Sequence, residues 1–539
     1  MSEQSPYRPD KALVAGTALL AWALFLLRYG YGFGFSDQDE FIPLAMRFVD
    51  GSLFRMDAFV AMQLEGFTIR MPMAGLVAIP SFLLPMWLVV FVLHMATGIG
   101  SGWAVAQMAH RFSDSAWVTP VATVTVLALT ARWNPGGNDI LHSMLVPSSV
   151  AWCALLWAFE RLSNRKFLAS GLLAAVGTLF HPLVGLQAGA ILMAGLFLLP
   201  GTSGKEKAHT VLPWLLMAGL AVMLFSGLGS SGLGSSGLGN DAGNANLSAI
   251  TILTHWRAPH HYLPSAFHWQ DAVQLLVPFA TALVLLARKH TSLPEWRLLS
   301  VVLVLPALVL LVSLAVTWWP LSLDAALRLQ PWALSPLLRV WSVLIAVVLV
   351  AGLLPIRPES DAPRAAISPS IILLLVGGAA LSLSLVRLAP DIRGAAHPDR
   401  ELHAWAAENT DVNAVFVIPP SMSGFQSGAK RAQYVSFKSF PFASGPTIEW
   451  WNRLQRMAPI DNPEPGGVAL QTRLDSAWAH QPVSGVRDFV ETEPVDFLVR
   501  PAIDPAHWSA SIKPQWCGQD WCVYWAGRIL RTNPQAALK

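Results

Sequence analysis

Long apolar runs, separated by short polar connections, occupy the chain up to about residue 390. A helix needs roughly 20 apolar residues to cross a bilayer, because in lipid its backbone groups can bond only within the segment. The pattern predicts eleven membrane-spanning helices, near residues 12–34, 86–109, 116–131, 143–160, 167–184, 185–200, 210–226, 273–287, 298–318, 335–356 and 367–386. The stretch 72–85 is predicted to be a further span, a re-entrant piece or an interfacial helix, which allows a count of 12 or 13.

The pattern changes after Val386, where apolar runs give way to short amphipathic and alternating segments. Two segments have the spacing of helices, at 401–408 and 447–457. Three others have the β-branched and aromatic content of strands, at 414–419, 495–499 and 523–529. Because helices and strands alternate, the sequence predicts a transmembrane domain over 1–386 and a soluble α/β domain over 387–539. The soluble part contains neither a Gly-rich phosphate fingerprint nor a nucleophile elbow.

The composition agrees with a membrane protein. Hydrophobic residues make up 54% of the 539 positions and charged residues 13%, and the mean hydropathy is +0.47. Soluble proteins carry about twice that charged fraction. The formal net charge is only +3, so charge gives no reason to expect nucleic acid as a partner.

The basic residues predict how the chain crosses the membrane, because Lys and Arg are enriched in cytoplasmic loops. They fall in six segments: the N-terminus with Arg8 and Lys11, His110-Arg111, 161–166, 205–207, 288–297 and 357–364. With eleven spans, all six lie on the cytoplasmic side. We therefore expect a multi-pass plasma-membrane protein with its N-terminus in the cytoplasm and its C-terminal domain outside.

Two long loops are then outside, at 35–71 and 227–272. The second loop opens with a tandem Ser-Gly-Leu-Gly repeat over 226–240, and Gly and Ser at this density form a flexible coil. A linker is the favoured interpretation. A mobile lid over a site is the alternative, since long loops often carry function.

Cysteine usage is sparse, with three in the chain. Cys517 and Cys522 flank Gly518-Gln519-Asp520 in a hairpin-like segment, where a disulfide can form in an oxidising compartment. A metal site would need two more soft ligands nearby, so we predict the disulfide.

The first outer loop carries the acidic candidates. Asp37, Asp39 and Glu40 lie within four positions, directly after the first predicted span. Partial burial and like-charge repulsion would raise the pKa of at least one of them, as a general base requires. The carboxylates of Asp37 and Asp39 could also bind Mg²⁺ or Mn²⁺. Taken alone, the cluster is better explained as an ordinary solvated loop, because acidic residues just outside a span are common.

Basic and aromatic candidates for binding a phosphate lie in other outer segments. His181 precedes Pro182 at the outer end of a predicted span, where a histidine more often has a structural role but can also contact a phosphate. The second long loop contains a group of five further candidates, namely His255, Arg257, His260, His261 and Tyr262. Arginine suits phosphate because its planar guanidinium donates two parallel hydrogen bonds.

These features together resemble the GT-C class of polytopic membrane glycosyltransferases, which carry an acidic motif in the first outer loop. The matching residues are Asp37-Gln-Asp-Glu40, the His181-Pro182 helix end, and the loop with Arg257, His260 and His261. Phe54-Arg-Met-Asp57, Pro259 to Pro264, Phe437 to Pro441 and Glu449-Trp-Trp451 resemble bacterial proteins of this architecture, which places the chain in a bacterial inner membrane with a periplasmic C-terminal domain.

The resemblance implies transfer of a sugar, with inversion, from a polyprenyl-phosphate-linked donor to a glycan, lipid or protein acceptor. Asp37 or Asp39, with Glu40 beside them, would supply the base. Arg257, the neighbouring histidines, Tyr262, His181 and Asp57 would bind the donor. The sequence departs from the class in having Asp-Gln-Asp-Glu rather than an acid pair beside aromatic or His residues, so the choice of base stays open.

Two other functions fit the same layout. One is an O-antigen-ligase-like transferase that uses Arg and His of the outer loops in place of an acid. The other is a non-enzyme, either a lipid or polysaccharide transporter or an assembly scaffold. The predicted spans are almost purely apolar, whereas transport pathways usually contain charged residues, so transport is less favoured.

Overall fold

The structure is a computed structural model that describes residues 10–113, 115–130, 132, 134–225, 248–289, 296–318, 330–351, 353, 368–395, 397–503, 506, 508 and 512–531. The Ser-Gly-Leu-Gly repeat lies outside the described residues. The chain divides into two compact units. The helical unit comprises 1–31, 91–222 and 260–389, and the α/β unit comprises 32–90, 223–259 and 390–539. The first outer loop and part of the second are therefore grouped with the C-terminal region.

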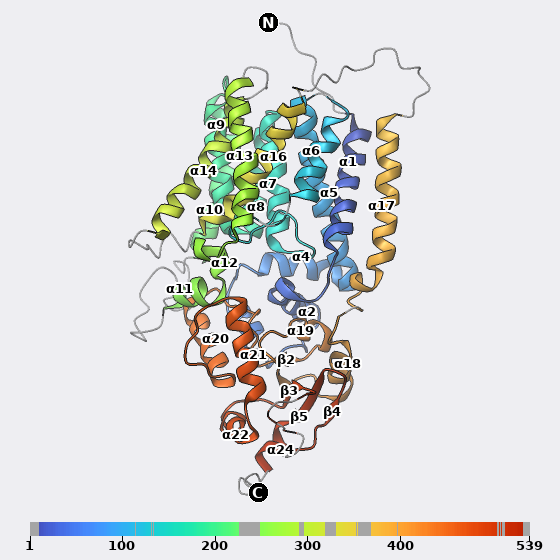
Figure 1. The fold of residues 1–539 in the computed structure, drawn as a ribbon, viewed down its shortest axis with the longest axis vertical. Coiled ribbons are helices and arrows are strands. Elements are labelled where there is room, and N and C mark those ends of the chain that lie inside the picture. Colours follow the sequence, from blue (N-terminus) through green and yellow to red (C-terminus); the bar gives the residue numbers. More distant parts are fainter. Residues whose placement is uncertain are drawn as a thin grey trace. The chain divides into compact units, whose positions relative to one another are not determined.

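The helical unit is built from long apolar helices and a few short turns (Figure 1). Its elements are α1 (Lys11–Tyr29), α5 (Met86–Ser113), α6 (Val118–Val124), η2 (Thr125–Leu129), α7 (Pro147–Ser163), α8 (Phe167–Phe180), α9 (Pro182–Leu198), α10 (Gly204–Phe225), α12 (Pro259–Tyr262), η4 (Pro264–Ala266), α13 (Trp269–Lys289), α14 (Trp296–Trp318), η6 (Pro331–Leu334), α16 (Ser335–Ala351) and α17 (Pro369–Ile392). The first residues of α5 and the last of α10 and α17 extend into the α/β unit.

Each of the eleven predicted spans overlaps at least one of these helices. Seven helices within the described residues are long and apolar enough to cross a membrane, namely α1, α5, α10, α13, α14, α16 with the turn before it, and α17. The chain is thus a multi-pass membrane protein, as predicted. The stretch 72–85 forms α4 (Met71–Ser81), whose 11 residues rise about 16 Å. That length is too short to span a bilayer alone, which favours the re-entrant or interfacial alternatives.

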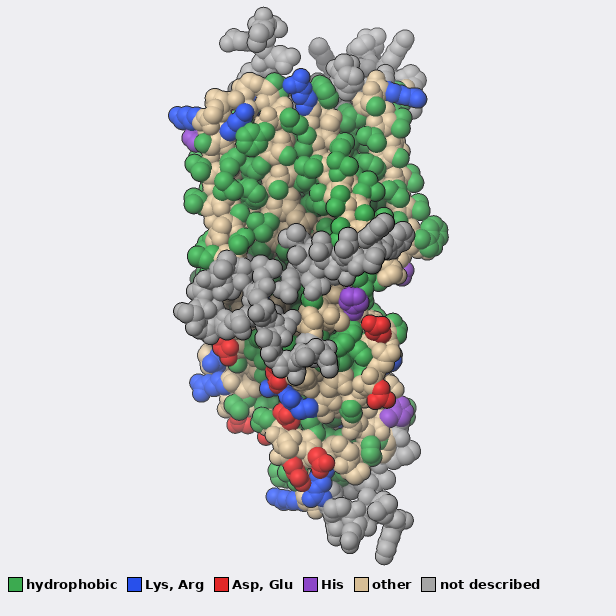
Figure 2. Space-filling view, turned by 90° about the vertical axis from the view of Figure 1, so that its left-hand side faces the viewer, with side chains coloured by type: hydrophobic (Ala, Val, Ile, Leu, Met, Phe, Trp, Pro, Cys, Tyr) green, Lys and Arg blue, Asp and Glu red, His purple; other side chains and the backbone are tan. Residues whose placement is uncertain are grey.

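Hydrogen bonds within the helical unit bring several basic segments to one end of it. Arg111 at the end of α5 donates to the Asn164 side chain after α7 over 2.7 Å, and Arg165 donates to the Pro200 carbonyl after α9 over 3.0 Å. Asp10, which caps α1, accepts from Ser370 at the start of α17. On the face in Figure 2, hydrophobic side chains cover this unit, and Lys and Arg gather at its upper end.

A buried polar network inside the helical unit was not anticipated from the sequence. Arg339 of α16 donates to Gln274 of α13 over 2.7 Å and to the Arg132 carbonyl over 2.9 Å. Asp139 accepts from Asn134 over 2.9 Å and pairs with Arg132 at 3.4 Å. The spans are therefore less purely apolar than predicted, because the 132–139 segment supplies partners for a buried arginine.

The α/β unit joins the first outer loop, part of the second and the C-terminal region. Its elements are η1 (Ser36–Glu40), α2 (Ile42–Val49), α3 (Ala58–Leu64), α4, α11 (Ala249–Thr251), η3 (Ile252–Arg257), α18 (Arg400–Asn409), β1 (Val415–Val417), α19 (Phe425–Ala429), β2 (Ala432–Gln433), α20 (Ser444–Met457), α21 (Val468–His480), α22 (Val483–Thr492), β3 (Phe497–Pro501), β4 (Trp516–Cys517), β5 (Trp521–Trp525) and α24 (Ala526–Arg531).

A five-stranded sheet with the order β2-β1-β3-β5-β4 forms the centre of this unit (Figure 1). β1 pairs in parallel with β2 and β3, whereas β5 pairs antiparallel with β3 and β4. Side chains alternate between its two faces, as the pleat requires. Phe416 and Val499 pack with α18 and α19, while Val417 and Leu498 pack with α20, α21 and α22. The predicted α/β class is confirmed.

The C-terminal hairpin carries the two neighbouring cysteines in directly opposed positions of β4 and β5. Cys517 and Cys522 form a disulfide with their Cα atoms 4.1 Å apart. The strand predicted over 523–529 is too long, because β5 ends at Trp525 and the chain continues as α24.

Candidate functional site

The acidic motif of the first outer loop forms η1, a single 3-10 segment. The Gly34 amide donates to the Gln38 side chain over 2.6 Å, which holds the loop in this conformation. A 3-10 helix has three residues per turn, so Asp37 and Glu40 lie on one side of it and Asp39 on another. The three predicted catalytic carboxylates therefore have different surroundings.

Asp39 is buried, with 3% of its surface exposed. Its carboxylate accepts a hydrogen bond from Ser423 Oγ over 2.5 Å and from the Gly424 amide over 3.0 Å. The Ser36 amide donates in turn to Ser423 Oγ. Burial raises the pKa of Asp39 to about 7, and the hydrogen bonds from Ser423 and Gly424 oppose that rise. Asp39 thus anchors the loop to the 423–424 turn.

Gly424 makes this anchor possible. Its φ of +82° lies in the left-handed region that favours glycine. A Cβ atom at this position would also collide with His397 Nε2 and with the Gly34 carbonyl. A side chain here would therefore displace the amide that faces Asp39.

Glu40 is buried and forms an ion pair with Arg70, the residue before α4. Arg70 also lies over the Phe442 ring, 4.7 Å from its centroid. Burial raises the pKa of Glu40 and the Asp37 charge adds to the rise, while Arg70, Lys438 and Arg257 lower it. This pair ties the end of the first loop to η1.

Asp37 is the most accessible of the three carboxylates, with 41% of its side chain exposed. It forms an ion pair with Lys438, a residue of the C-terminal region. Arg257 of η3 donates to the Lys438 carbonyl over 3.3 Å, and its guanidinium lies 5.0 Å from the centroid of the Phe437 ring. Three separate segments of the chain therefore meet at Lys438.

These six groups form what we call the charged cluster: Asp37, Asp39, Glu40, Arg70, Arg257 and Lys438. Three carboxylates face three cations, so the cluster is balanced by formal charge. An accessible carboxylate beside two cations can accept a proton and bind an anion in the same place. That combination suits transfer chemistry in which the leaving group is a phosphate.

Asp57, a predicted donor-binding residue, lies at the start of α3. It caps α3 by accepting from the Val60 amide over 3.0 Å. Its other oxygen accepts from the Gln426 side chain over 2.6 Å and the Gln433 amide over 3.0 Å. Asp57 is fully buried, and burial raises its pKa. These contacts hold the first loop against β2 and α19.

The predicted phosphate-binding histidines are divided between the two units. His255 belongs to the α/β unit, where its ring hydrogen-bonds Thr254 Oγ1 at 2.8 Å. His260, His261 and Tyr262 belong to the helical unit, where His261 Nδ1 lies 2.6 Å from the Gly136 carbonyl. His181 caps α9 there, accepting from the Val184 amide over 3.3 Å. Of the predicted donor-binding set, Arg257 is a member of the charged cluster.

Among the described residues, the one group of three metal-ligating side chains with ligand atoms within 4.8 Å of one another is His397, Asp399 and His403. Burial lowers the pKa of both histidines, to about 3 for His403. The Mg²⁺ or Mn²⁺ expected at Asp37 and Asp39 stays a prediction. In this structure Asp37 pairs with Lys438, and Asp39 accepts from Ser423 and Gly424.

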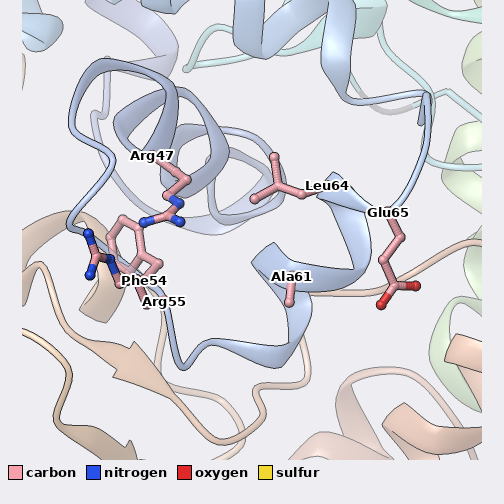
Figure 3. Close-up of a pocket in the computed structure, with 6 residues that line it drawn as sticks. All are labelled: Arg47, Phe54, Arg55, Ala61, Leu64 and Glu65. Carbon is pink, nitrogen blue, oxygen red and sulfur yellow. The ribbon is translucent and has the colours of Figure 1, made fainter.

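A pocket of about 280 Å³ lies within the first outer loop (Figure 3). It is lined by Arg47, Phe54, Arg55, Ala61, Leu64 and Glu65. Arg47 donates to the Leu53 carbonyl over 2.9 Å, which holds the turn between α2 and α3. None of the three predicted catalytic carboxylates lines this pocket, so it is separate from the charged cluster.

Sequence reasoning missed Ser423 and Lys438 as site residues. Lys438 could have been noticed as a single charge within the aromatic run Phe437-Lys-Ser-Phe-Pro441. Ser423 gives no such signal, because it matters only through its distant partner Asp39. The His397-x-Asp-x-x-x-His403 spacing could have been found, since its last two members are one helical turn apart.

A family model described as a domain of unknown function, DUF6798, matches residues 397–457. This stretch contains His397, His403, Ser423 and Lys438. A comparison with curated proteins found no match.

Solved structures with a related backbone include the Archaeoglobus fulgidus oligosaccharyltransferase tethered with an acceptor peptide that contains the NVT sequon. It is 11% identical over 91% of this chain and 68% of that chain, with a TM-score of 0.44. A structure of the same protein in complex with Zn and sulfate has a TM-score of 0.38, at the same identity and coverage. Apo ArnT from Cupriavidus metallidurans is 11% identical over 97% of this chain and 98% of that chain, with a TM-score of 0.42.

At TM-scores of 0.38 to 0.44 and 11% identity, these similarities assign no activity to this chain.

Proposed function

We propose that this protein is a membrane glycosyltransferase that moves a sugar from a polyprenyl-phosphate-linked donor to a glycan, lipid or protein acceptor on the outer face of the membrane. The observation that carries the proposal is the pairing of Asp37 with Lys438, with Arg257 alongside. A base for the acceptor and cations for the donor phosphate are thus adjacent.

The proposed step is a displacement at the anomeric carbon of the sugar. The acceptor hydroxyl loses its proton to a carboxylate, and its oxygen forms a bond to the anomeric carbon. The bond from that carbon to the phosphate oxygen breaks, and polyprenyl phosphate leaves with the electron pair. Attack from the opposite side inverts the configuration. Charge develops on the phosphate, so fixed cations beside it lower the barrier.

Asp37 is the carboxylate best suited to act as the base. A general base must come within hydrogen-bond reach of the proton that it accepts, and Asp37 is the exposed member of the three. Asp39 and Glu40 already have their oxygens engaged by Ser423, Gly424 and Arg70. We assign these two the role of positioning η1.

Lys438 and Arg257 are the proposed phosphate ligands. Lys438 provides a compact charge at Asp37, and donor binding would draw it toward the phosphate, leaving the Asp37 carboxylate for the acceptor. Arg257 is held between its contact with the Lys438 carbonyl and the faces of Phe437 and Phe440. A guanidinium oriented in this way is ready to donate to phosphate oxygens.

The orientation forms part of the proposal, with the N-terminus in the cytoplasm and the α/β unit in the periplasm of a bacterial inner membrane. Two observations support it. The basic connections that meet at one end of the helical unit are typical of a cytoplasmic surface. The Cys517–Cys522 disulfide belongs to the other unit and is typical of an oxidising compartment.

Membranes that contain the full-length protein test the proposal directly. They are incubated with a panel of radiolabelled polyprenyl-phosphate sugars, and label is counted in the glycan, lipid and protein fractions. Wild type should transfer label from one donor, whereas Asp37→Asn should not. If no donor supports transfer and proteoliposomes show substrate counterflow, the protein is a transporter and not an enzyme.

The second candidate is a ligase-like transferase that uses Arg257 without a carboxylate base. It is favoured by the close approach of Arg257 to Lys438, which would serve a phosphate leaving group equally well. Transfer that survives both Asp37→Asn and Asp39→Asn, but is lost in Arg257→Ala, would select this candidate.

A further inference from the structure

Three potential metal ligands converge at the start of α18, in a part of the α/β unit that the proposed transfer reaction does not use. Asp399 is the residue before the helix, His403 lies on its first turns, and His397 precedes both. The rings of His397 and His403 have their centroids 4.7 Å apart, and His397 Nδ1 lies 3.9 Å from Asp399 Oδ2. Two imidazoles and one carboxylate therefore share one small space.

His397 is oriented by a backbone partner. Its Nε2 lies 3.0 Å from the Ser423 carbonyl, and because a carbonyl only accepts, Nε2 carries the proton. Nδ1 is then the nitrogen with a lone pair, and it faces Asp399, whose amide donates to it over 3.1 Å. Histidines that bind metals usually donate their second ring nitrogen to a carbonyl or carboxylate in this way.

Asp399 is also held from behind. Trp521 Nε1 of β5 donates to Asp399 Oδ1 over 2.6 Å, which leaves Oδ2 on the side of His397. The hydrogen bond fixes the rotation of the carboxylate. Both His397 and Asp399 thus have an outer partner that directs the remaining ligand atom toward the other.

His403 supplies the observation that calls for a ligand. The residue is 4% exposed, and its Nε2 is buried without a hydrogen-bond partner among the described residues. A buried polar atom left unpaired destabilises the fold, because it loses its hydrogen bond to water and gains none. Its other nitrogen, Nδ1, faces Gly428, where a Cβ atom would collide with the ring. The ring is therefore closely packed with Nε2 unsatisfied.

We propose that His397, Asp399 and His403 bind one divalent transition-metal ion, with Zn²⁺ the best match. Two imidazole nitrogens and a carboxylate oxygen, with a fourth position left for water, form a recognised zinc ligand set. Mg²⁺ and Ca²⁺ prefer oxygen ligands and fit a site with two nitrogens poorly. The ion would replace the Asp399 amide as the partner of His397 Nδ1 and supply a partner for His403 Nε2.

The site is distinct from the Mg²⁺ or Mn²⁺ position expected at Asp37 and Asp39, and metal binding there does not depend on sugar transfer. Metal binding by the three ligands would affect the structure around Ser423. The carbonyl of Ser423 accepts from His397, and its hydroxyl donates to Asp39. A bound ion would fix His397 and so hold the turn that anchors η1, which makes the three ligands positioning residues for the charged cluster.

Metal content of the purified full-length protein in detergent tests the proposal without any need for turnover. The protein is stripped with a chelator, titrated with Co²⁺ and followed by its visible absorption bands, and Zn²⁺ is then added in competition. Wild type should bind about one Co²⁺ per chain with the intense bands of a four-coordinate site, and Zn²⁺ should displace it.

Variants locate the ion. His403→Ala and Asp399→Asn should each weaken Co²⁺ binding more than 10-fold, whereas His480→Ala, which removes an exposed histidine of α21, should leave it unchanged. Trp521→Phe keeps all three ligands and loses only the donor to Asp399, so a 10- to 100-fold weakening is expected even if the ligand variants fail to fold. Wild type without absorption bands, or with affinity equal to that of His403→Ala, would overturn the proposal. The two histidines would then be a packed ring pair.

Discussion

Ser423 Oγ donates a hydrogen bond to Asp39 Oδ2 over 2.5 Å, although 384 positions separate the two residues. The Gly424 amide adds a second donor to the same carboxylate. An acidic loop that follows the first helix is thereby fastened to a turn of the C-terminal region. The same turn reaches His397 through the Ser423 carbonyl. The position of η1, and hence of Asp37, therefore depends on residues near the other end of the chain.

The roles assigned to Asp37 and Asp39 predict different effects of the same substitution. Asp37→Asn should lower kcat about 10²- to 10⁴-fold with little change in thermal stability, because it removes the proposed base from an exposed position. Asp39→Asn should change the melting temperature as well as the rate. Asp50→Asn, at an exposed site of the same loop, is the matched control for expression and activity. Full activity of Asp37→Asn would assign the base elsewhere.

Asp39 also predicts how stability depends on pH. Burial raises its folded pKa from 3.8 to about 7, so the folded state holds a proton that the unfolded state releases. Stability from this group is present below pH 3.8 and is lost as the pH rises to about 7. Melting temperatures in detergent should therefore fall over this range more steeply for wild type than for Asp39→Asn. Parallel curves for the two proteins would show that Asp39 is not the responsible group.

Lys438 predicts the strength of donor binding. Lys438→Ala should weaken binding of polyprenyl phosphate about 10- to 100-fold, since hydrogen bonds to charged groups contribute about 1.5–3 kcal/mol. Lys438→Arg keeps the charge and should retain most of the affinity. Binding is measured through the rise in melting temperature on adding the lipid phosphate. Lys513→Ala, at an exposed position of the same unit, should bind as wild type does, and equal binding by Lys438→Ala would remove Lys438 from the phosphate site.

Helices and strands could be predicted from single segments of the sequence, whereas partners from distant segments could not. Apolar runs placed a helix in each of the eleven predicted spans, because burial in lipid is a property of one segment. The continuous run of β-branched and aromatic residues at Val415, Phe416 and Val417 likewise predicted β1 from local sequence alone. The pairing of Ser423 with Asp39 depends on the tertiary fold, so no periodic pattern in the sequence indicates it. The predicted donor-binding role of His260 beside Arg257 stays a prediction, because the two residues belong to different units.

Asp57 predicts a loss of stability without a specific loss of donor affinity. Asp57→Ala removes a helix cap worth about 1 kcal/mol and leaves the Gln433 amide and Gln426 side chain as buried unpaired donors, at about 1–3 kcal/mol each. Chemical denaturation should show a large drop in the free energy of unfolding. Asp411→Ala, which removes an exposed turn carboxylate, should stay close to wild type. Unchanged stability with weakened binding of polyprenyl phosphate would instead support the donor-binding role predicted from the sequence.

The disulfide is expected to stabilise the α/β unit and to form only if this unit lies in an oxidising compartment. Closing so short a loop contributes about 2 kcal/mol in the chain-entropy model, so Cys517→Ser with Cys522→Ser should lower the melting temperature. In cells, the hairpin becomes oxidised only if it is exported. The chain has three cysteines, of which Cys153 is free. Denatured protein from cells treated with a polymer-linked maleimide should therefore gain one label without reductant and three after reduction. Three labels without reductant would place the hairpin in the cytoplasm and reverse the proposed orientation.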